Sequence, residues 1–366
     1  MKLKKLLVDM YLASNLGDDL FLDILANKFK TSNITLNYYN SDYDEFIANY
    51  NNINRRQFSI LDKISSRLSN DIQKDRQTAK SFDALVFIGG SIFMENNSYH
   101  RALYNKRMSL AREFGRLSKP IYVLGANFGP YSTVSFYNEY LAFFELCSDV
   151  CFRDYYSYNL FSHLPQVRYA PDIVFQLSPG KYKTKSTKKL VGFSIIDVRK
   201  KKGLSEYYED YIRSTIKSIE VFQNLGYECC LMSFCSREGD LKTINTIVER
   251  LSQKKLEKVV IYNYQGDIGR TLEVIATCEL FIAARFHGTI LSLVLDTGII
   301  PVIYNEKTTN VLKDINLDQL IVEMENIQLQ YDLPTIQQGF NNKLDIIPIK
   351  KESEKHFQYL SEYCTE

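Results

Sequence analysis

The stretch LFIAARFHGTILSLVLDTGIIPVIY, residues 280–304, decides the fold. A short apolar run at 280–284 ends at Arg285, an apolar helical stretch begins at Gly288, and a second apolar run completes the segment. A strand, a helix and another strand in this order are typical of a parallel sheet. The sequence therefore predicts an α/β protein.

The same alternation of buried strand and polar turn recurs along the chain. An apolar run followed by a polar turn is found in ALVFIGGS (84–91), PIYVLGANFGP (120–130) and DVCFRD (149–154). A second series starts with LVGFSII (190–196). Ligands of such folds bind beyond the carboxyl ends of the strands, where the glycine-rich and charged turns collect here. We expect two doubly wound, Rossmann-like domains that face a cleft.

A polar, basic segment without periodicity separates the two series. It predicts a linker at 179–189, between an N-terminal domain at 1–178 and a C-terminal domain at 190–326. The tail at 327–366 is weakly patterned, and we expect it to be helical and to pack back on the N-terminal domain. Residues 42–80 carry apolar residues at helical spacing and are expected to form a helical excursion.

Composition excludes several classes of protein. The chain has 366 residues, 45% of them hydrophobic, and its 45 Lys and Arg against 43 Asp and Glu leave a formal charge of +2. That balance provides no long-range attraction to nucleic acid, so any anion recognition is local. There is no Walker pattern, no HExxH or CxxC pair, and no GxGxxG in the first strand-to-helix turn. We expect no catalytic metal.

The cysteines and the N-terminus point to a cytoplasmic protein. The seven cysteines lack metal-ligand spacing, and most lie in apolar patterns, as free thiols do. The basic and then apolar start is too short for a signal peptide and is broken by Asp9. No run approaches the roughly 18 apolar residues that span a bilayer.

Arg285 and His287 form the most informative turn. They lie in the turn between a strand and the following helix. The free N–H groups and the positive dipole end at the N-terminus of that helix favour an anion. A guanidinium grips a carboxylate or phosphate with two hydrogen bonds, and a histidine donates to the same group or moves a proton. The alternative is that Arg285 pairs with a buried carboxylate and His287 only caps the helix.

Arg153 repeats this pattern in the first half of the chain. It follows the apolar run DVCF directly, and a local ion pair with Asp154 is the alternative to a ligand-binding role. Two arginines from two domains in one cleft would hold a doubly charged anion better than either alone. We therefore predict that Arg153 and Arg285 bind one dianion together.

The glycine turns allow a ligand to approach the main chain closely. In GGS (89–91) and GANFGP (125–130), Ser91 and Asn127 are candidates for bonding sugar hydroxyls. Purely steric use of glycine in tight turns is the alternative. In NLGDD (15–19), Asp18 is a good helix N-cap whether or not it contacts a substrate.

Six motifs follow one another over roughly residues 10–315: NLGDD, FIGGS, GANFGP, CFRDYYSYNLF, YAPDIVF and ARFHGTILSLVLDTGIIPVIYNEKTTNVL. Together they resemble the polysaccharide pyruvyl transferase family. The resemblance implies a fold similar to the two-domain GT-B glycosyltransferases. It also implies transfer of pyruvate from phosphoenolpyruvate to a sugar of a cell-surface polysaccharide, as a ketal. GGSIFM departs from the more usual three glycines, and we expect Ser91 to alter the acceptor side.

The family match assigns roles to particular residues. The donor-binding set that it implies is Arg153, Arg285, Phe286, His287, Gly288 and Lys307. The acceptor-binding set is Asn15, Gly17, Gly89, Gly90, Ser91, His100, Asn127 and Gly129, although a lone histidine in a polar loop is often structural or solvated. His287 is the first candidate for proton transfer, and Asp18 or Asp172 for activating the hydroxyl, since ketal formation needs a general acid and a general base. Phosphoenolpyruvate is a co-substrate, and no cofactor is expected.

Two other functions remain open, as does a membrane contact. A GT-B glycosyltransferase would present Arg285 to the diphosphate of a nucleotide sugar, and a non-catalytic anion or glycan sensor would keep the scaffold alone. The basic segments at 181–189 and 199–202 suggest docking on an anionic inner leaflet to reach a lipid-linked oligosaccharide. A solvated linker and loop explain the same charges.

Overall fold

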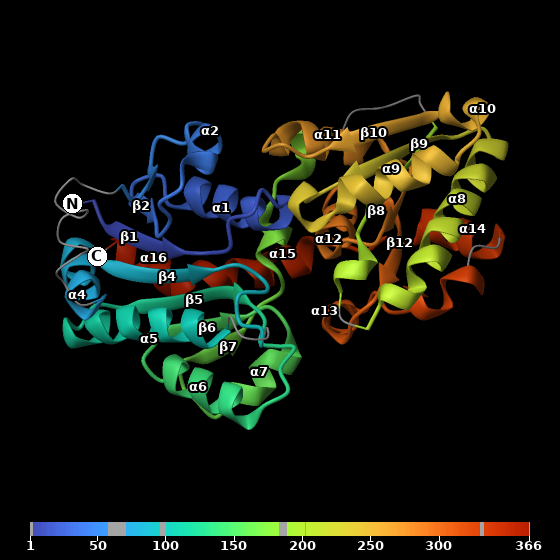
Figure 1. The fold of residues 1–366 in the computed structure, drawn as a ribbon. Coiled ribbons are helices and arrows are strands. Elements are labelled where there is room, and N and C mark those ends of the chain that lie inside the picture. The colour runs from blue at the N-terminus through green and yellow to red at the C-terminus, as the bar shows by residue number, and fades with distance from the viewer. Residues whose placement is uncertain are drawn as a thin grey trace. The chain divides into compact units, whose positions relative to one another are not determined.

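The computed structural model describes residues 3–57, 71–95, 100–182, 189–201, 203–329 and 333–365. By their contacts the residues divide into two compact units. The first unit comprises Met1–Leu12, Phe21–Ile173 and Lys351–Glu366. The second comprises Ala13–Leu20 and Val174–Lys350. In each unit helices pack around a parallel sheet (Figure 1).

The sheet of the first unit has seven strands within the described residues, in the order β3-β2-β1-β4-β5-β6-β7, and every pair is parallel. The strands are β1 Lys5–Asp9, β2 Asn33–Leu36, β3 Ile53–Arg55, β4 Ala84–Ile88, β5 Ile121–Ala126, β6 Asp149–Phe152 and β7 Val167–Tyr169. The helices of this part of the chain are α1 Leu16–Lys28, α2 Asp44–Ile47, α4 Asp71–Ser81, α5 His100–Arg116, α6 Val134–Phe144 and α7 Tyr155–Phe161.

Helices cover both faces of this sheet, which is why β4 and β5 are buried at every position. On β5, Ile121 and Val123 belong to an apolar cluster with Phe143 of α6. Tyr122 between them contacts Tyr363, with ring centroids 6.2 Å apart. Because successive side chains of a strand point to opposite faces, α6 and the C-terminal helix α16 (Gln358–Thr365) lie on opposite sides.

The C-terminal segment is tied to the first unit by a buried histidine. His356, in the 3-10 turn Glu354–Phe357, contacts the carbonyl oxygen of Pro171 through Nε2 at 2.9 Å. A carbonyl only accepts, so Nε2 carries the hydrogen and donates it. The guanidinium of Arg168 donates to the carbonyl of His356 at 3.0 Å. Burial, and then the charge of Arg168, lower the pKa of His356 to about 3.

This histidine predicts a loss of stability in acid. In the unfolded chain this histidine is protonated below its usual pKa of 6.5, whereas in the folded chain it stays neutral down to about pH 3. The free energy of unfolding therefore falls as the pH drops through that window. We expect a loss of about 2 kcal/mol between about pH 7.5 and about pH 5, measured by urea unfolding. His356→Gln should lose this dependence, whereas the exposed His163→Gln should keep it. Equal pH profiles for both variants would contradict the prediction.

The sheet of the second unit has six described strands in the order β10-β9-β8-β11-β12-β13, again all parallel. They are β8 Leu190–Ile195, β9 Glu228–Ser233, β10 Val259–Asn263, β11 Leu280–Ala283, β12 Gly298–Ile303 and β13 Val322–Glu323. The helices are α8 Tyr208–Asn224, α9 Asp240–Arg250, α10 Gln253–Leu256, α11 Ile268–Thr277, α12 Phe286–Val294, α13 Glu306–Asp314, α14 Leu333–Asn341 and α15 Ile347–Ser353, which continues into the first unit.

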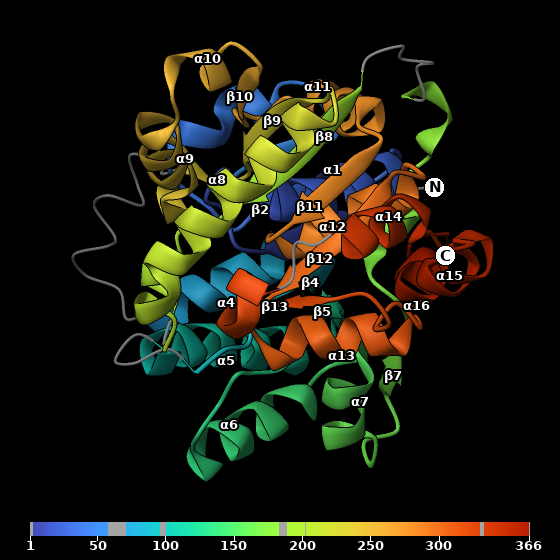
Figure 2. The ribbon, with the colours of Figure 1, turned by 90° about the vertical axis from the view of Figure 1, so that its right-hand side faces the viewer.

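Side chains of β8 show which helices lie on which face. Ile195 belongs to one apolar cluster with Ile219 of α8 and Ile244 of α9, and these two helices run along that face (Figure 2). Ser194 points the other way, toward α12, where a β carbon on Gly288 would lie 2.8 Å from its hydroxyl. The second unit is therefore doubly wound as well, and the predicted fold class is confirmed.

The unit borders differ from the domain limits expected from the sequence. By its contacts, the chain passes from the first unit to the second after Ile173, not after the expected residue 178. The second unit then extends to Lys350 instead of residue 326. The extension has a steric basis: a β carbon on Gly298 of β12 would lie 2.8 Å from the carbonyl oxygen of Gly339, so α14 packs directly on this strand. Most of the expected linker at 179–189 lies outside the described residues.

Two further features concern the chain as a whole. The stretch 42–80, expected to be helical, contains the strand β3, and its residues 58–70 lie outside the described ranges. All seven cysteines are free; six are buried and Cys364 is partly exposed. Within the described residues, no helix has both the length and the apolar character to cross a membrane.

Candidate functional site

The strand order of the second unit marks one position as a binding site. The chain runs outward from β8 through β9 to β10, then returns to pair β11 on the other side of β8. In doubly wound sheets ligands bind at this reversal, beyond the carboxyl ends of the strands. Arg285 lies there, directly after β11.

The strand-to-helix turn holds Arg285 firmly. Arg285 occupies the N-cap position of α12 in an extended conformation, and its backbone N–H donates to the Ser194 hydroxyl at 3.1 Å. All residues of α12 from Gly288 to Val294 are buried, so the helix is anchored by its apolar content. Phe286 and His287, the first two residues of the helix, are only half-buried. The turn thus presents polar groups on a rigid base.

Two carboxylates contact the Arg285 guanidinium. Nε donates to Asp240 at 3.0 Å, Nη2 contacts the same carboxylate, and Nη1 donates to Glu238 at 2.8 Å. Burial lowers the pKa of Arg285, but Asp240 and Glu238 outweigh it and hold that pKa above its usual value. The pairing with a buried carboxylate, left open by the sequence, is therefore present. It leaves Arg285 charged, with 10% of its side chain exposed.

Asp240 is the fixed partner of this arginine. Its Oδ2 accepts the backbone N–H groups of Phe234 and Cys235 at 3.1 and 2.9 Å, and the residue is fully buried. A carboxylate with this many donors is well compensated, although buried charge is costly. Asp240 therefore orients the fork of Arg285.

The segment Ala13–Leu20 belongs to the second unit and lies against the same turn. The backbone N–H of Leu16 donates to the Phe234 carbonyl at 3.1 Å, and a β carbon on Gly17 would lie only 2.0 Å from Nδ1 of His287. Only glycine fits there. The structure thus brings three of the predicted residues, Asn15, Gly17 and His287, together with Arg285 in one unit.

The acidic residues of this segment are arranged differently from the sequence-based expectation. Asn15, not Asp18, caps α1, because its side-chain oxygen accepts the N–H of Gly17 at 2.9 Å. Asp18 is half-buried in the first turn. Its neighbour Asp19 is almost completely buried and accepts a hydrogen bond of 2.7 Å from the Tyr264 hydroxyl.

In the first unit, the predicted residues Arg153, Asp172, Asn127 and Gly90 also come together. Arg153 donates to Asp172 at 2.7 Å and to the Asn127 side-chain oxygen at 3.1 Å. A β carbon on Gly90 would lie 2.3 Å from the guanidinium. Asp154 caps α7 through the Ser157 N–H at 2.8 Å.

These contacts make Arg153 part of a buried ion pair within the first unit. Arg153 is 1% exposed and Asp172 is 0% exposed, so the pair is internal. Asp172, expected to activate a hydroxyl, and Asn127, expected to bond a sugar, are both engaged with this arginine. That Arg153 and Arg285 bind one dianion stays a prediction.

The other predicted residues lie as follows. Gly89 and Gly129 have φ of 135° and 96°, a backbone region that favours glycine. Ser91 is exposed. His100 begins α5 and Lys307 lies in α13, and both side chains fall outside what the structure describes.

Sequence reasoning missed four polar residues near the carboxyl strand ends of the second unit: Lys201, Glu238, Asp240 and Tyr264. The polar turn SREGD after β9 was the signal for Glu238 and Asp240, and Lys201 lies in the basic run 199–202 that was interpreted as a membrane contact. In the first unit it missed Asp9 at the end of β1, which accepts from Arg107 at 3.1 Å. Among the described residues, no group of three or more His, Cys, Asp or Glu side chains is arranged to hold a metal ion.

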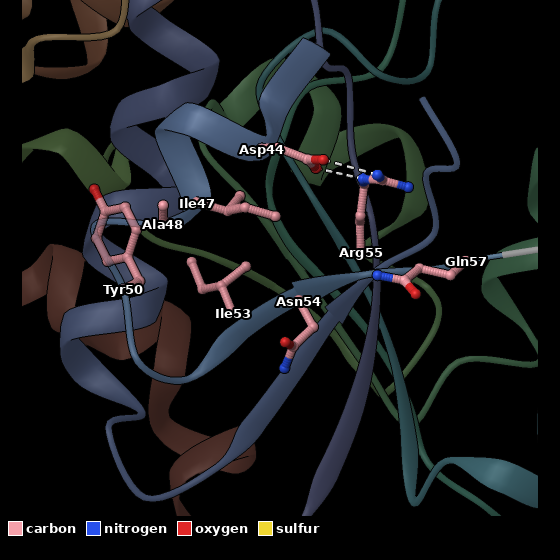
Figure 3. A pocket seen from close by; sticks show the side chains of 8 residues that line it. All are labelled: Asp44, Ile47, Ala48, Tyr50, Ile53, Asn54, Arg55 and Gln57. Atoms are coloured by element: carbon pink, nitrogen blue, oxygen red, sulfur yellow. Dashed lines mark hydrogen bonds and ion pairs between the residues drawn. The ribbon is translucent and has the colours of Figure 1, made fainter. Parts of the chain in front are cut away.

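One surface pocket lies away from these sites. It measures about 250 Å³, and Figure 3 shows its lining side chains around the ion pair of Asp44 and Arg55, whose Nη2 lies 2.8 Å from Oδ2. The pocket borders β3, the edge strand of the first unit. None of the site residues predicted from the sequence lines it.

Comparison with known proteins decides the family. A sequence profile described as "Polysaccharide pyruvyl transferase" matches residues 15–306. The chain belongs to this family. The curated amylovoran biosynthesis protein AmsJ of Erwinia amylovora is 21% identical over 279 residues. The match covers 70% of the present chain and 65% of AmsJ, so the chain spans a little less than two thirds of the length of that relative.

Solved structures agree on the fold alone. The UDP-GlcNAc 2-epimerase of Methanocaldococcus jannaschii, in complex with UDP-GlcNAc and UDP, has a TM-score of 0.61 at 12% identity and covers 98% of this chain and 99% of its own. Anabaena Alr3699/HepE, in complex with UDP and glucose, has a TM-score of 0.58 at 11% identity, with coverage of 97% and 100%. This family member therefore has a GT-B-like fold.

Proposed function

We propose that this protein transfers pyruvate from phosphoenolpyruvate to a sugar of a cell-surface glycan and forms a pyruvyl ketal. The family match over residues 15–306 carries the proposal. It is supported by the position of Arg285 and His287, which share one strand-to-helix turn at the strand-order reversal of the second unit. Phosphoenolpyruvate is a co-substrate, and the proposal includes no resident cofactor or metal.

The reaction forms one C–H bond and two C–O bonds, breaks the C–O bond to phosphate, and turns the C=C double bond into a single bond. A proton is added to the methylene carbon, a sugar hydroxyl forms a bond to C2, and the bond from C2 to the phosphate oxygen breaks as a second hydroxyl closes the ring. Two hydroxyl protons are released; one balances the protonation of carbon and the other leaves with phosphate. The enzyme must therefore neutralise phosphate charge and move protons.

The second unit supplies groups for both tasks. Arg285, oriented by Asp240, stabilises the anion, and α12 adds the partial positive charge of its N-terminus. His287 is the candidate for proton transfer, since an imidazole changes protonation near neutral pH. Phe286, Gly288 and Lys307 complete the part of the proposed donor set that lies in the second unit, and Arg153 is its member from the first unit.

The acceptor side and the membrane contact are also proposals. A glycan or lipid-linked oligosaccharide would meet Ser91 and the glycine turns of the first unit. Of residues 199–201, the part of this basic segment that the structure describes, Arg199 is paired with Asp197 at 2.9 Å and Lys201 with Glu238 at 3.0 Å. Lys200 is exposed, and its Nζ donates to the carbonyl oxygen of Arg237 at 3.1 Å. Sedimentation with anionic vesicles at low and high salt tests docking at the inner membrane face.

The decisive experiment is a donor assay with the purified protein. Release of phosphate from phosphoenolpyruvate that depends on an acceptor glycan, with a new ketal methyl signal in the product, supports the proposal. Turnover of a nucleotide sugar in place of phosphoenolpyruvate supports a glycosyltransferase, for which the UDP-bound structural relatives provide an analogy. If the protein shows neither activity but binds the anions or the glycan, the result supports a sensor.

Gly17→Ala should lower this activity without a comparable loss of stability. The new methyl group would overlap the imidazole of His287 and displace it. Misplacement of a reacting group by about 1 Å costs on the order of a hundredfold in rate. Initial rates and the thermal midpoint are the measurements. Gly115→Ala, a site with no atom within 4 Å of the new carbon, is the control and should keep full activity.

A further inference from the structure

The carboxylate of Glu238 is held by three donors from three separate parts of the chain. Oε2 accepts from Nη1 of Arg285 at 2.8 Å and from Nζ of Lys201 at 3.0 Å. Oε1 accepts from the side-chain amide of Asn15 at 3.4 Å. Two cations and a neutral donor thus converge on one pair of carboxylate oxygens, as they would on a bound anion.

The donors meet at the strand-order reversal of the second unit. Lys201 follows β8, and Arg285 follows β11, the two strands between which the order changes. Asn15 lies in the segment whose Gly17 contacts His287. The group that they surround therefore occupies the place where ligands of this fold bind.

Glu238 and Asp240 differ in how firmly they are held. Asp240 accepts two backbone N–H groups, and its side chain is 0% exposed. Its removal would leave the buried charge of Arg285 without its fixed partner. The side chain of Glu238 is 24% exposed and lies at the end of the short 3-10 turn Ser236–Glu238. Its carboxylate accepts hydrogen bonds from the side chains of Arg285, Lys201 and Asn15. Glu238 can therefore leave while Asp240 keeps Arg285 in position.

The electrostatics of the cluster support the same distinction. Burial raises the pKa of Glu238, but the charges of Arg285 and Lys201 lower it to about 2. The carboxylate is therefore ionised at neutral pH. It competes at that pH with any anion for the same donors.

We propose that Lys201, Arg285 and Asn15 form an oxyanion subsite, that Glu238 fills it in the absence of ligand, and that a phosphate or carboxylate group of the donor replaces Glu238. The naming of the donor rests on the proposed function; the subsite itself does not. Lys201 and Asn15 are then ligand-binding residues. Glu238 sets donor affinity by competition.

Calorimetric titration of the protein and its variants tests this assignment, with phosphoenolpyruvate, inorganic phosphate, pyruvate and UDP as separate ligands. Lys201→Met should weaken binding about tenfold or more, because it removes one charge-assisted hydrogen bond. Glu238→Gln should tighten binding by several fold, because it removes the competing charge. If the two substitutions change the affinity for phosphate but not for pyruvate, the subsite binds the phosphate group of the donor. If they change the affinity for pyruvate but not for phosphate, it binds the carboxylate.

Matched controls come from the same unit. Lys200→Met changes the adjacent exposed lysine, and Glu209→Gln changes a glutamate paired with Arg250 on the surface at 2.6 Å. Both should bind as the unaltered protein does. If Lys201→Met unfolds, Lys201→Arg keeps the charge and should bind within a few fold of the unaltered protein, and Glu238→Gln still tests the competition.

The results separate the subsite from the proposed function. Glu238→Gln binding no more tightly than Glu209→Gln, or Lys201→Met binding as well as Lys200→Met, overturns the subsite even if phosphoenolpyruvate turnover is found. Dependence on Lys201 and Glu238 with UDP alone supports the subsite and overturns phosphoenolpyruvate as the donor.

Discussion

Arg285→Lys should lower kcat/KM for phosphate release from phosphoenolpyruvate by about a hundredfold or more, the cost of removing a preorganised donor from developing charge. Lysine keeps a positive charge beside Asp240 and so avoids an unpaired buried carboxylate. It loses the planar fork that contacts Asp240 and Glu238 together. Initial rates with the acceptor glycan are the measurement.

Arg250→Lys provides the matched control for this variant. Arg250 also forms a two-armed contact with a carboxylate, Glu209, at 2.6 and 3.1 Å, but it does so on the exposed surface. The control should retain its full rate, and both variants should unfold cooperatively. An Arg285→Lys enzyme that is folded and as fast as the control would remove Arg285 from the mechanism.

Arg153→Met should lower the free energy of unfolding by about 3–5 kcal/mol, the usual cost of leaving one charge of a buried pair alone. The charge left behind is that of Asp172, which is fully buried 2.7 Å from Nη1. Urea unfolding measures the loss. The double variant Arg153→Met with Asp172→Asn should be more stable than the single one, because no uncompensated charge remains.

The double variant also separates two roles of Arg153. If the arginine serves only to hold the first unit together, the rate of phosphate release should recover with the stability. If it binds the donor, as the sequence predicts, the folded double variant should stay slow, with a raised KM for phosphoenolpyruvate. Removal of the exposed pair Arg250 and Glu209 should change stability far less and serves as the control.

Strong local patterns in the sequence predicted the architecture. The apolar run of β11, the polar turn at Arg285 and the largely apolar α12 appear where residues 280–294 placed them. Buried parallel strands are continuous apolar runs, and these are visible without any tertiary information. The short strands β2 and β3 were missed, since three or four residues of mixed polarity become strands only by pairing with β1 and with each other.

The sequence by itself determined a doubly wound α/β protein with an arginine and a histidine at one strand end, because apolar periodicity and turn residues are local properties. Only the tertiary structure decided what each charge contacts. It pairs Arg153 with Asp172, and it gathers Lys201, Arg285 and Asn15 around Glu238 although they lie far apart in the chain. Ion pairs depend on distances across the fold, and residue spacing along the sequence does not record those distances.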